Sequence, residues 1–302
     1  MAEKIPAILS WSGGKDCAYT LCKVLQEAQY DVKYLLSFLR EETRALNMHE
    51  VSEILIEQQA AATGIPLIKV FVSDSSNTTY EKQLANAIEI VKAGDIHHII
   101  FGDLFLQDLR QYREVSMQQL GMNCVFPIWQ IPSHLLMNDF IGRGFRAITC
   151  CIDAVKLSKD FIGRELDHSF INDLPEEVDP CGENGEYHSF CYDAPCFLNP
   201  VEIHAGRIYF KPLELKTLDK AGSKNLVQGY WFCELLAAKL KGTRKECARC
   251  RQPFNCRQED ISNCHCYGIV ISPEANEKIK GKYTGCLCRQ CLQQLAEHNT
   301  DV

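Results

Sequence analysis

The sequence lacks any long apolar run. None of its segments approaches the roughly 20 apolar residues that a membrane-crossing helix needs. The apolar stretch at residues 5–11 is also too short for a signal peptide, and no cleavage site of small residues follows it. These absences argue against a membrane protein and against a secreted precursor, so we expect a cytoplasmic protein with no membrane partner.

An excess of positive charge is also missing, because the formal net charge of the 302 residues is −7 at pH 7. Proteins that bind along a nucleic-acid backbone need a basic face. The charge is uneven: residues 239–302 hold 11 Lys and Arg against 7 Asp and Glu, a net charge of +4, so the rest carries −11. A nucleic-acid contact is therefore open only for this basic tail.

Two common nucleotide-binding loops are absent. The G-x-x-x-x-G-K-[ST] pattern of a Walker loop does not occur. A Gly-x-Gly-x-x-Ala pattern does occur at residues 142–147, but it precedes a predicted strand, whereas a dinucleotide loop follows one. Internal repeats and low-complexity tracts are missing as well, and the length then predicts two or three globular domains.

The first half of the sequence contains a regular alternation of apolar and amphipathic segments. Such an alternation is typical of β/α units around a parallel sheet that is covered on both faces. We expect strands at residues 5–11, 32–38, 66–72, 97–103, 123–129 and 145–152, and helices at 17–28, 49–64, 79–94, 107–121 and 132–144. The alternation ends near residue 155, which predicts a first domain of residues 1–155.

A smaller α+β domain is predicted for residues 156–240. Segments 189–198, 200–206 and 207–215 have the composition of antiparallel strands around turns. A polar stretch with two glycines, residues 218–229, predicts a linker. We expect a helix at 230–242 that leads into a cysteine-rich tail, residues 243–302.

The loop SWSGGKDC, residues 10–17, follows the first predicted strand and opens the first predicted helix. Ligands of parallel sheets bind beyond the carboxyl ends of the strands. Glycines let the backbone approach a phosphate closely, and a helix N-terminus supplies free N–H groups and positive potential. Lys15 adds a charge. The alternative is a plain strand–helix turn.

This loop resembles the PP-loop of ATP pyrophosphatases, in the form found in the diphthine–ammonia ligase-related family. Three more segments resemble that family: residues 47–67, residues 101–121 with Gly-Asp followed by Arg-x-x-x-Glu, and DPCGENGEYHSF at 179–190. The resemblance implies a HUP-like, adenine nucleotide alpha hydrolase-like fold for the first domain. It departs from the family at two positions, where Cys17 replaces the usual serine and Asn184 a glycine.

The resemblance also implies residue roles. Three of the positions concerned also have a purely structural interpretation: Asp16 as a helix cap, His49 as a structural residue, and segment 182–186 as a solvated turn. Arg110 and Glu114 are spaced as a surface pair, and Cys181 is a candidate nucleophile. The residues implied to bind ATP are Ser10, Ser12, Gly13, Gly14, Lys15, Asp16, Cys17, Met48, His49 and Gly102, and those implied to act in the reaction or to hold Mg²⁺ are Asp103, Arg113, Glu183 and Glu186.

The tail holds eight of the 17 cysteines, with the spacing C-x2-C-x5-C-x7-C-x-C-x19-C-x-C-x2-C. In a reducing compartment such a group indicates metal binding more than disulfides, and eight thiolates suffice for two four-coordinate Zn²⁺ sites. His265 is a spare ligand, and reduced cysteines without metal are the alternative. The tail resembles the bacterial cysteine-rich CWC domain, which implies a bacterial source, where diphthamide is absent. The predicted metal ligands are Cys247, Cys250, Cys256, Cys264, Cys266, Cys286, Cys288 and Cys291.

These patterns lead to one main functional hypothesis. An ATP-dependent ligase would adenylate a carboxylate or amide oxygen of a small molecule or a protein-borne group, release pyrophosphate, and let ammonia or an amine displace AMP. An RNA-thiolating PP-loop enzyme is the first alternative, supported by the cysteines and the basic tail. A nucleotide sensor without catalysis is the second. A homodimer is left open.

Overall fold

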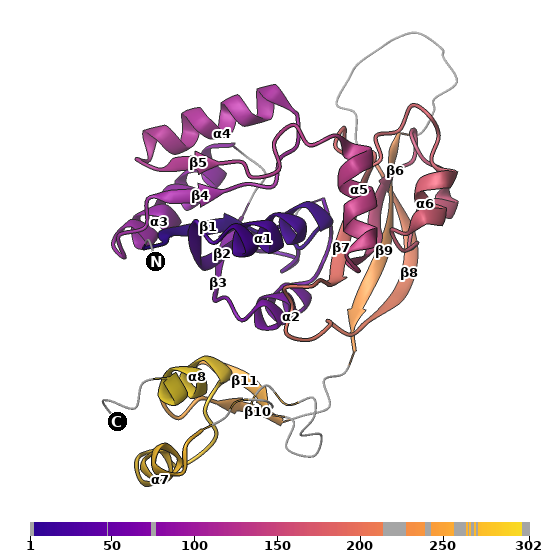
Figure 1. The fold of residues 1–302 in the computed structure, drawn as a ribbon. Coiled ribbons are helices and arrows are strands. Elements are labelled where there is room, and N and C mark those ends of the chain that lie inside the picture. Colours follow the sequence, from indigo (N-terminus) through magenta and orange to yellow (C-terminus); the bar gives the residue numbers. More distant parts are fainter. Residues whose placement is uncertain are drawn as a thin grey trace, which may run out of the picture. The chain divides into compact units, whose positions relative to one another are not determined.

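The computed structural model describes residues 3–46, 48–73, 77–213, 228–238, 243–256, 264, 266, 269 and 271–297. The chain divides by its contacts into two units, Met1–Ala237 and Ala238–Val302, and each is described by itself (Figure 1). Among the described residues, none of the helices has the length and apolar character needed to cross a membrane.

The first sheet of unit one is parallel and has the strand order β3-β2-β1-β4-β5. Each strand is followed by a helix, as the alternating pattern predicted, and the expected α/β class is confirmed. The strands are β1 (Ile5–Ser10), β2 (Tyr30–Arg40), β3 (Leu67–Val72), β4 (His98–Ile100) and β5 (Asn123–Val125), and the helices are α1 (Lys15–Glu27), α2 (Glu53–Thr63), α3 (Asn77–Lys92), α4 (Gln107–Gln119) and α5 (Ser133–Gly142).

Side chains that alternate along β1 enter different apolar clusters. Ile8 packs with residues of α3 and α4, whereas Ala7 and Leu9 pack with residues of α1, α2 and α5. Successive side chains of a strand point to opposite faces, so helices cover both faces of this sheet. Because helices cover both faces, a ligand can reach this sheet only at the strand ends, where β1 and β4 are followed by loops.

The second sheet of unit one is antiparallel, with the order β7-β6-β9-β8. Two expectations are wrong here. The segment at 145–152, expected as the last parallel strand, is a strand but pairs antiparallel with β7 and β9. The elements of this second region are β6 (Arg146–Asp153), the short 3-10 helix η1 (Lys159–Phe161), α6 (His168–Asp173), β7 (Tyr187–Asp193), β8 (Ile203–Pro212) and β9 (Gly229–Ala237).

The expected helix at 230–242 is the second error, because β9 occupies this segment up to Ala237. Its aromatic residues favour a strand, and β9 gains partners on both sides in β6 and β8. The two strands expected at 200–206 and 207–215 form one strand, with an irregular register between Ala205 and Ile208 in place of a turn. Most of the predicted linker, residues 218–227, lies outside the described residues, as do residues 239–242.

The two sheets of unit one share a core. The larger cluster contains Leu9 of β1, Leu21 of α1 and Phe190 of β7, all fully buried. A disulfide between Cys22 of α1 and Cys196, beyond β7, joins the same two regions. The second sheet is therefore fixed against the helix that follows the glycine loop.

Unit two is small. Its strands β10 (Thr243–Glu246) and β11 (Pro253–Cys256) pair antiparallel, and its helices are α7 (Pro273–Lys282) and α8 (Arg289–Glu297). Among its described residues, the core cluster consists of Cys247, Leu287, Cys291 and Leu295. Two of these four residues are cysteines, so apolar side chains alone do not build this core.

Candidate active site and cysteine groups

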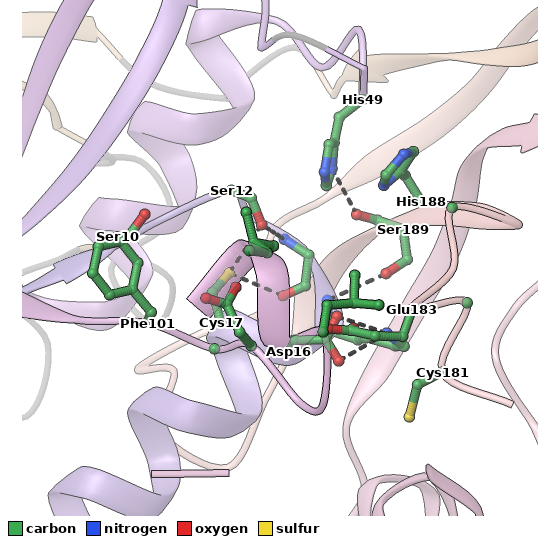
Figure 2. Close-up of a pocket in the computed structure, with 18 of the residues that line it drawn as sticks. Ser10, Ser12, Asp16, Cys17, His49, Phe101, Cys181, Glu183, His188 and Ser189 are labelled. Carbon is green, nitrogen blue, oxygen red and sulfur yellow. Dashed lines mark hydrogen bonds and ion pairs between the residues drawn. The ribbon is translucent and has the colours of Figure 1, made fainter. Parts of the chain in front are cut away.

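A cleft of about 250 Å³ lies at the carboxyl ends of β1 and β4 (Figure 2). Four parts of the chain line it: the glycine loop with the start of α1, His49 between β2 and α2, the segment from the end of β4 to α4, and the segment around the start of β7. The lining residues are Ser10, Ser12, Gly14, Lys15, Asp16, Cys17, His49, Phe101, Gly102, Asp103, Leu106, Leu109, Arg113, Cys181, Gly182, Glu183, Gly185, Tyr187, His188 and Ser189.

Most of the residues that the sequence indicated therefore lie at one cleft, and three do not line it. Gly13 lies behind the wall, Met48 is 37% exposed, and Glu186 is buried beneath its loop. One carboxylate oxygen of Glu186 accepts from the Asn184 side-chain amide, at 3.1 Å. This arrangement fixes the turn before β7, and it keeps Glu186 away from the space that a ligand would occupy.

Gly13 anchors the loop from behind. Its φ angle is +72°, and a Cβ atom at this position would lie 2.5 Å from Oε1 of Gln59. The amide of Gln59 donates to the carbonyl of Gly13 at 2.8 Å, and the backbone N–H of Cys191 donates to the same carbonyl at 2.8 Å. Only glycine fits this conformation and this close contact. Gln59 and β7 thus hold the loop in place.

Cys17 occupies the position of the usual family serine and hydrogen-bonds within the loop. Its thiol donates to the carbonyl of Gly14 at 3.1 Å and accepts from the hydroxyl of Ser12 at 3.6 Å. Ser12 also accepts from the N–H of Gly14 at 3.3 Å. Burial raises the pKa of Cys17 to about 11, so this thiol is protonated at neutral pH and acts as a donor in the loop.

Lys15 is the cation of the cleft. Its side chain is 3% exposed, and Nζ lies 2.6 Å and 2.8 Å from the two carboxylate oxygens of Asp16. Burial disfavours the ammonium, but the negative charge of Asp16 and its hydrogen bonds to Nζ outweigh this cost and hold the pKa of Lys15 above its ordinary value. The cleft therefore contains a permanent positive charge at the N-terminus of α1, where the helix dipole also favours anions.

Carboxylates line the wall beyond Lys15. Asp103 forms a two-pronged ion pair with Arg113, at 2.5 Å and 3.1 Å, and the guanidinium lies 4.3 Å from the ring centre of Phe101. Glu183 accepts from the N–H of Leu104 at 3.1 Å. Burial and then the charge of Asp16 raise the pKa of Glu183 to about 7. Glu183 thus changes its protonation near neutral pH.

Two histidines form another wall of the cleft, and Figure 2 shows their rings next to Ser189. The ring centres of His49 and His188 are 4.8 Å apart. Nδ1 of His49 lies 3.2 Å from the carbonyl of Ser189, so this nitrogen carries the proton and Nε2 is left as an acceptor. Burial lowers the pKa of His49 to about 3 and that of His188 to about 4, which keeps both rings neutral at pH 7.

Sequence reasoning missed Gln59, Tyr187 and Ser189. The hydroxyl of Ser189 accepts from the N–H of Lys15 at 3.2 Å, although the two residues are 174 positions apart. All three lie inside segments that carried the family resemblance, at 47–67 and 179–190. That resemblance was the available signal, but it did not indicate which side chains of those segments meet the loop. Arg110 and Glu114 pair at 2.8 Å on the outside of α4, as their spacing predicted.

The cysteines of unit two lie in groups. Sγ atoms of Cys247, Cys250, Cys288 and Cys291 all lie within 4.8 Å of one another. The other four predicted ligands lie in two pairs, Cys256 with Cys286 at 3.8 Å and Cys264 with Cys266 at 3.3 Å. The spare ligand candidate, His265, lies outside the described residues. A cysteine group that can hold a metal ion is therefore present, as the sequence predicted.

Comparison with known proteins identifies the relatives of this chain. The diphthamide synthase N-terminal domain matches residues 5–124, the diphthamide synthase C-terminal domain matches 132–221, and the cysteine-rich CWC domain matches 247–293. The chain is 23% identical to the Homo sapiens diphthine–ammonia ligase over 70% of its own length and 92% of that protein. It is 24% identical to the Bos taurus diphthine–ammonia ligase over 69% and 91%.

A Schizosaccharomyces pombe diphthine–ammonia ligase is 26% identical over 36% of this chain, a match that spans only 19% of that longer relative. The resemblance predicted from the sequence motifs is confirmed by these matches. Because the two diphthamide synthase domains together match more than two thirds of the residues, the chain belongs to the diphthamide synthase family.

Proposed function

We propose that this protein is an ATP-dependent ligase, which joins ammonia or an amine to a carboxylate and converts ATP to AMP and pyrophosphate. One observation carries the proposal: a single cleft gathers a permanently charged lysine at a helix N-terminus, a set of carboxylates and two neutral imidazoles. The family relatives are named diphthine–ammonia ligases. A cation next to carboxylates and neutral bases is the arrangement that such a two-step reaction needs.

The phosphates of ATP are proposed to bind at the glycine loop. Lys15 and the first turn of α1 supply positive charge, and Gly14 has no side chain between the backbone and a phosphate. Phosphate would compete with Asp16 for the ammonium of Lys15. Arg113 already has Asp103 as a partner, so its proposed contribution is to orient that carboxylate and to add positive charge to the wall.

The cleft also fits Mg²⁺, which prefers oxygen ligands and is commonly held by one or two carboxylates together with substrate phosphates. Asp16 and Asp103 would hold it. Their charges both raise the pKa of Glu183, which means that the three carboxylates crowd one another. A divalent cation would relieve this crowding. When bound, Mg²⁺ would neutralise charge that develops on the leaving pyrophosphate.

The proposed reaction has two steps. A carboxylate oxygen of the acceptor attacks the α-phosphorus of ATP, the bond from this phosphorus to the bridging oxygen breaks, and pyrophosphate leaves. The amine nitrogen then attacks the acyl carbon, AMP leaves with the former carboxylate oxygen, and the nitrogen loses a proton. Glu183, with its pKa near 7, is proposed to take this proton, and Nε2 of His49 to accept a hydrogen bond from the amine.

The cysteines of the cleft argue against the thiolation alternative. Sulfur transfer needs a thiolate. Burial raises the pKa of Cys181 to about 12 and that of Cys17 to about 11, so both are protonated thiols at neutral pH. A nucleotide sensor, in turn, would leave Glu183 without a role. We therefore retain the ligase as the proposed function.

Product analysis tests the proposal. ATP labelled at the α-phosphate is incubated with the purified protein, Mg²⁺, ammonium and candidate carboxylates, beginning with a protein that bears diphthine, the group for which the relatives are named. We expect AMP and pyrophosphate in equal amounts, dependent on the acceptor. Lys15→Met should abolish their formation, whereas Lys23→Met, a change on the exposed side of the same helix, should not. ADP and phosphate as products would contradict the proposal.

A further inference from the structure

The eight cysteines of unit two lie in one group of four and two pairs, and the boundary of the group of four runs between Cys286 and Cys288. These cysteines are separated by Leu287 alone, which is buried. Spacing alone would assign the whole of C-x-C-x2-C at 286–291 to one site. The structure divides it, with Cys288 and Cys291 in the group of four and Cys286 in a pair with Cys256 of β11.

The first group has the geometry of a closed tetrahedral site. Four thiolates around Zn²⁺ at about 2.3 Å have sulfur atoms about 3.8 Å apart. Sγ atoms of Cys250 and Cys288 are 3.6 Å apart, and all four Sγ atoms lie within 4.8 Å of one another. The N–H of Cys288 donates to Sγ of Cys247 at 3.3 Å, which stabilises negative charge on that sulfur. The ligands come from the turn after β10 and from the start of α8.

The other four cysteines lie in two pairs, which do not form a compact group like that of the first four. The Sγ atoms of Cys256 and Cys286 are 3.8 Å apart, again the edge of a tetrathiolate site, and those of Cys264 and Cys266 are 3.3 Å apart. Disulfide sulfurs would be about 2.05 Å apart, so neither pair is a disulfide. Nζ of Lys245 donates to Sγ of Cys286 at 3.4 Å.

We propose that unit two binds two zinc ions. One is held by the formed group Cys247, Cys250, Cys288 and Cys291, and the other would draw together the two pairs Cys256 with Cys286 and Cys264 with Cys266. Each site is closed by four thiolates, so both ions are structural. The small core of this unit explains why it needs them. The two sites adjoin at segment 286–288 but share no ligand.

The charge of the tail fits two such sites. A zinc ion with four thiolates carries a net charge of −2, and two of them carry −4. Residues 239–302 have a net charge of +4 before any metal is counted. The positive net charge of residues 239–302 had allowed a nucleic-acid contact. The negative charge of the two zinc sites therefore balances it within the same unit. Neutralisation by its own metal sites gives these lysines and arginines a role without a nucleic-acid partner.

The assignment is tested on the full chain by exchanging the metal for ¹¹³Cd and recording NMR correlations between cadmium and the cysteine β-protons. We expect two cadmium signals, each coupled to four cysteines, with Cys286 and Cys288 correlated to different ions. Elemental analysis of the protein as purified should give two zinc ions per chain. A correlation of Cys286 and Cys288 to the same cadmium would overturn the assignment, and so would iron, one ion or no metal in the purified protein.

Substitutions give an independent test through zinc retained against a competing chelator. Cys250→Ser with Cys288→Ser removes two ligands of one site, whereas Cys286→Ser with Cys288→Ser removes one ligand from each. We expect the first double variant to retain one zinc ion and the second double variant to retain no tightly bound zinc. Cys124→Ser, a half-buried free cysteine of unit one, is the control and should retain both. Equal retention by the two double variants would overturn the proposal.

Discussion

Unit one buries its side chains in two extended apolar clusters, whereas the core cluster of unit two consists, among its described residues, of two leucines and two cysteines. A unit of this size cannot offset the entropy of ordering its chain with so little apolar burial. Unit one has two sheets and helices on both faces of the parallel one. The comparison teaches that the two units need different sources of stability, apolar burial in the first and metal ligation in the second.

The cysteines show the same contrast. In unit one they are core residues, such as Cys150 and Cys191, which have no exposed surface, or they join α1 to the region beyond β7 in a disulfide. In unit two they face one another in groups of thiols. A chelator should therefore act on unit two, and a reductant on unit one. This separation gives the two largest predicted effects.

Removing the metal should unfold unit two and leave unit one intact. The binding free energy of a structural zinc ion is on the order of 10 kcal/mol and is also folding free energy, so the apo unit should lose its structure. The measurement is the dispersion of amide NMR signals of unit two after treatment with a zinc-selective chelator, with Mg²⁺ in excess. ATP affinity, measured by calorimetry in the same sample, should stay unchanged. A parallel loss of ATP binding would break the comparison, because the tail would then belong to the active site.

Reducing the disulfide should destabilise unit one alone. Cys22 and Cys196 are 174 residues apart, and disulfides that close long loops typically contribute about 3 kcal/mol. All three tryptophans, Trp11, Trp129 and Trp231, lie in unit one, so their fluorescence during denaturant unfolding reports on this unit. Cys22→Ser should lower the free energy of unfolding by that amount, with Cys124→Ser as the control.

The disulfide itself is checked by counting free thiols in the denatured, metal-free protein. The chain has 17 cysteines, and 15 should react if the bond is present. Zinc content should be the same with and without a phosphine reductant. If all 17 thiols react, unit one gains nothing from the bond and rests on burial alone.

Replacing Lys15 should reduce ATP affinity. A hydrogen bond to a charged group is worth about 1.5–3 kcal/mol, which corresponds to a loss of roughly tenfold to more than a hundredfold in affinity. Lys15→Met is compared by calorimetry with Lys23→Met, which removes a surface pair with Glu27 from the same helix. An unchanged affinity of Lys15→Met would show that the cation of the cleft does not contact the phosphates.

The sequence predicted the elements of unit one better than their pairing. Alternating apolar segments are a local signal, and five of the six expected strands lie in the parallel sheet. The sixth, β6, has the same local signal but pairs with β7 and β9, which follow it in the chain. Residues 230–237 were expected to be helical, yet cross-strand partners outweigh that local preference. Local patterns carry no information about such partners.

The same limit applies to the site. The loop at residues 10–17 was found because its glycines and lysine are adjacent in sequence. Gln59, which bonds to Gly13 and to Cys191 at separations of 46 and 132 residues, has no local signature. The division of cysteines between Cys286 and Cys288 was hidden for a similar reason, since ligands in C-x-C spacing are expected to act together. Spacing predicts the donor atoms of a site, but the fold decides their grouping.

Acid should destabilise unit one through its buried histidines, and this is the smallest of the predicted effects. The pKa of His49 is about 3 in the folded chain against 6.5 for an ordinary histidine. Below pH 6.5 the unfolded chain therefore binds a proton that the folded chain does not, and stability falls as the pH is lowered from 6.5 towards 3. At pH 5 this group alone should cost about 2 kcal/mol.

His49→Gln should remove that part of the pH dependence, because the glutamine amide can still donate to the carbonyl of Ser189 but does not titrate. The measurement is the free energy of unfolding of unit one at pH 7 and pH 5, followed by tryptophan fluorescence. The drop between the two pH values should be about 2 kcal/mol smaller in His49→Gln than in the parent chain. His134→Gln, an exposed position on α5, is the control and should keep the full drop.

Unit two should also be lost in acid, since protons compete with zinc for thiolates, but His49→Gln should leave its zinc release unchanged. If the variant alters zinc release as well, the two units are not energetically independent. Apolar burial in unit one and metal ligation in unit two would then stabilise each other, and the two sources of stability could not be treated separately.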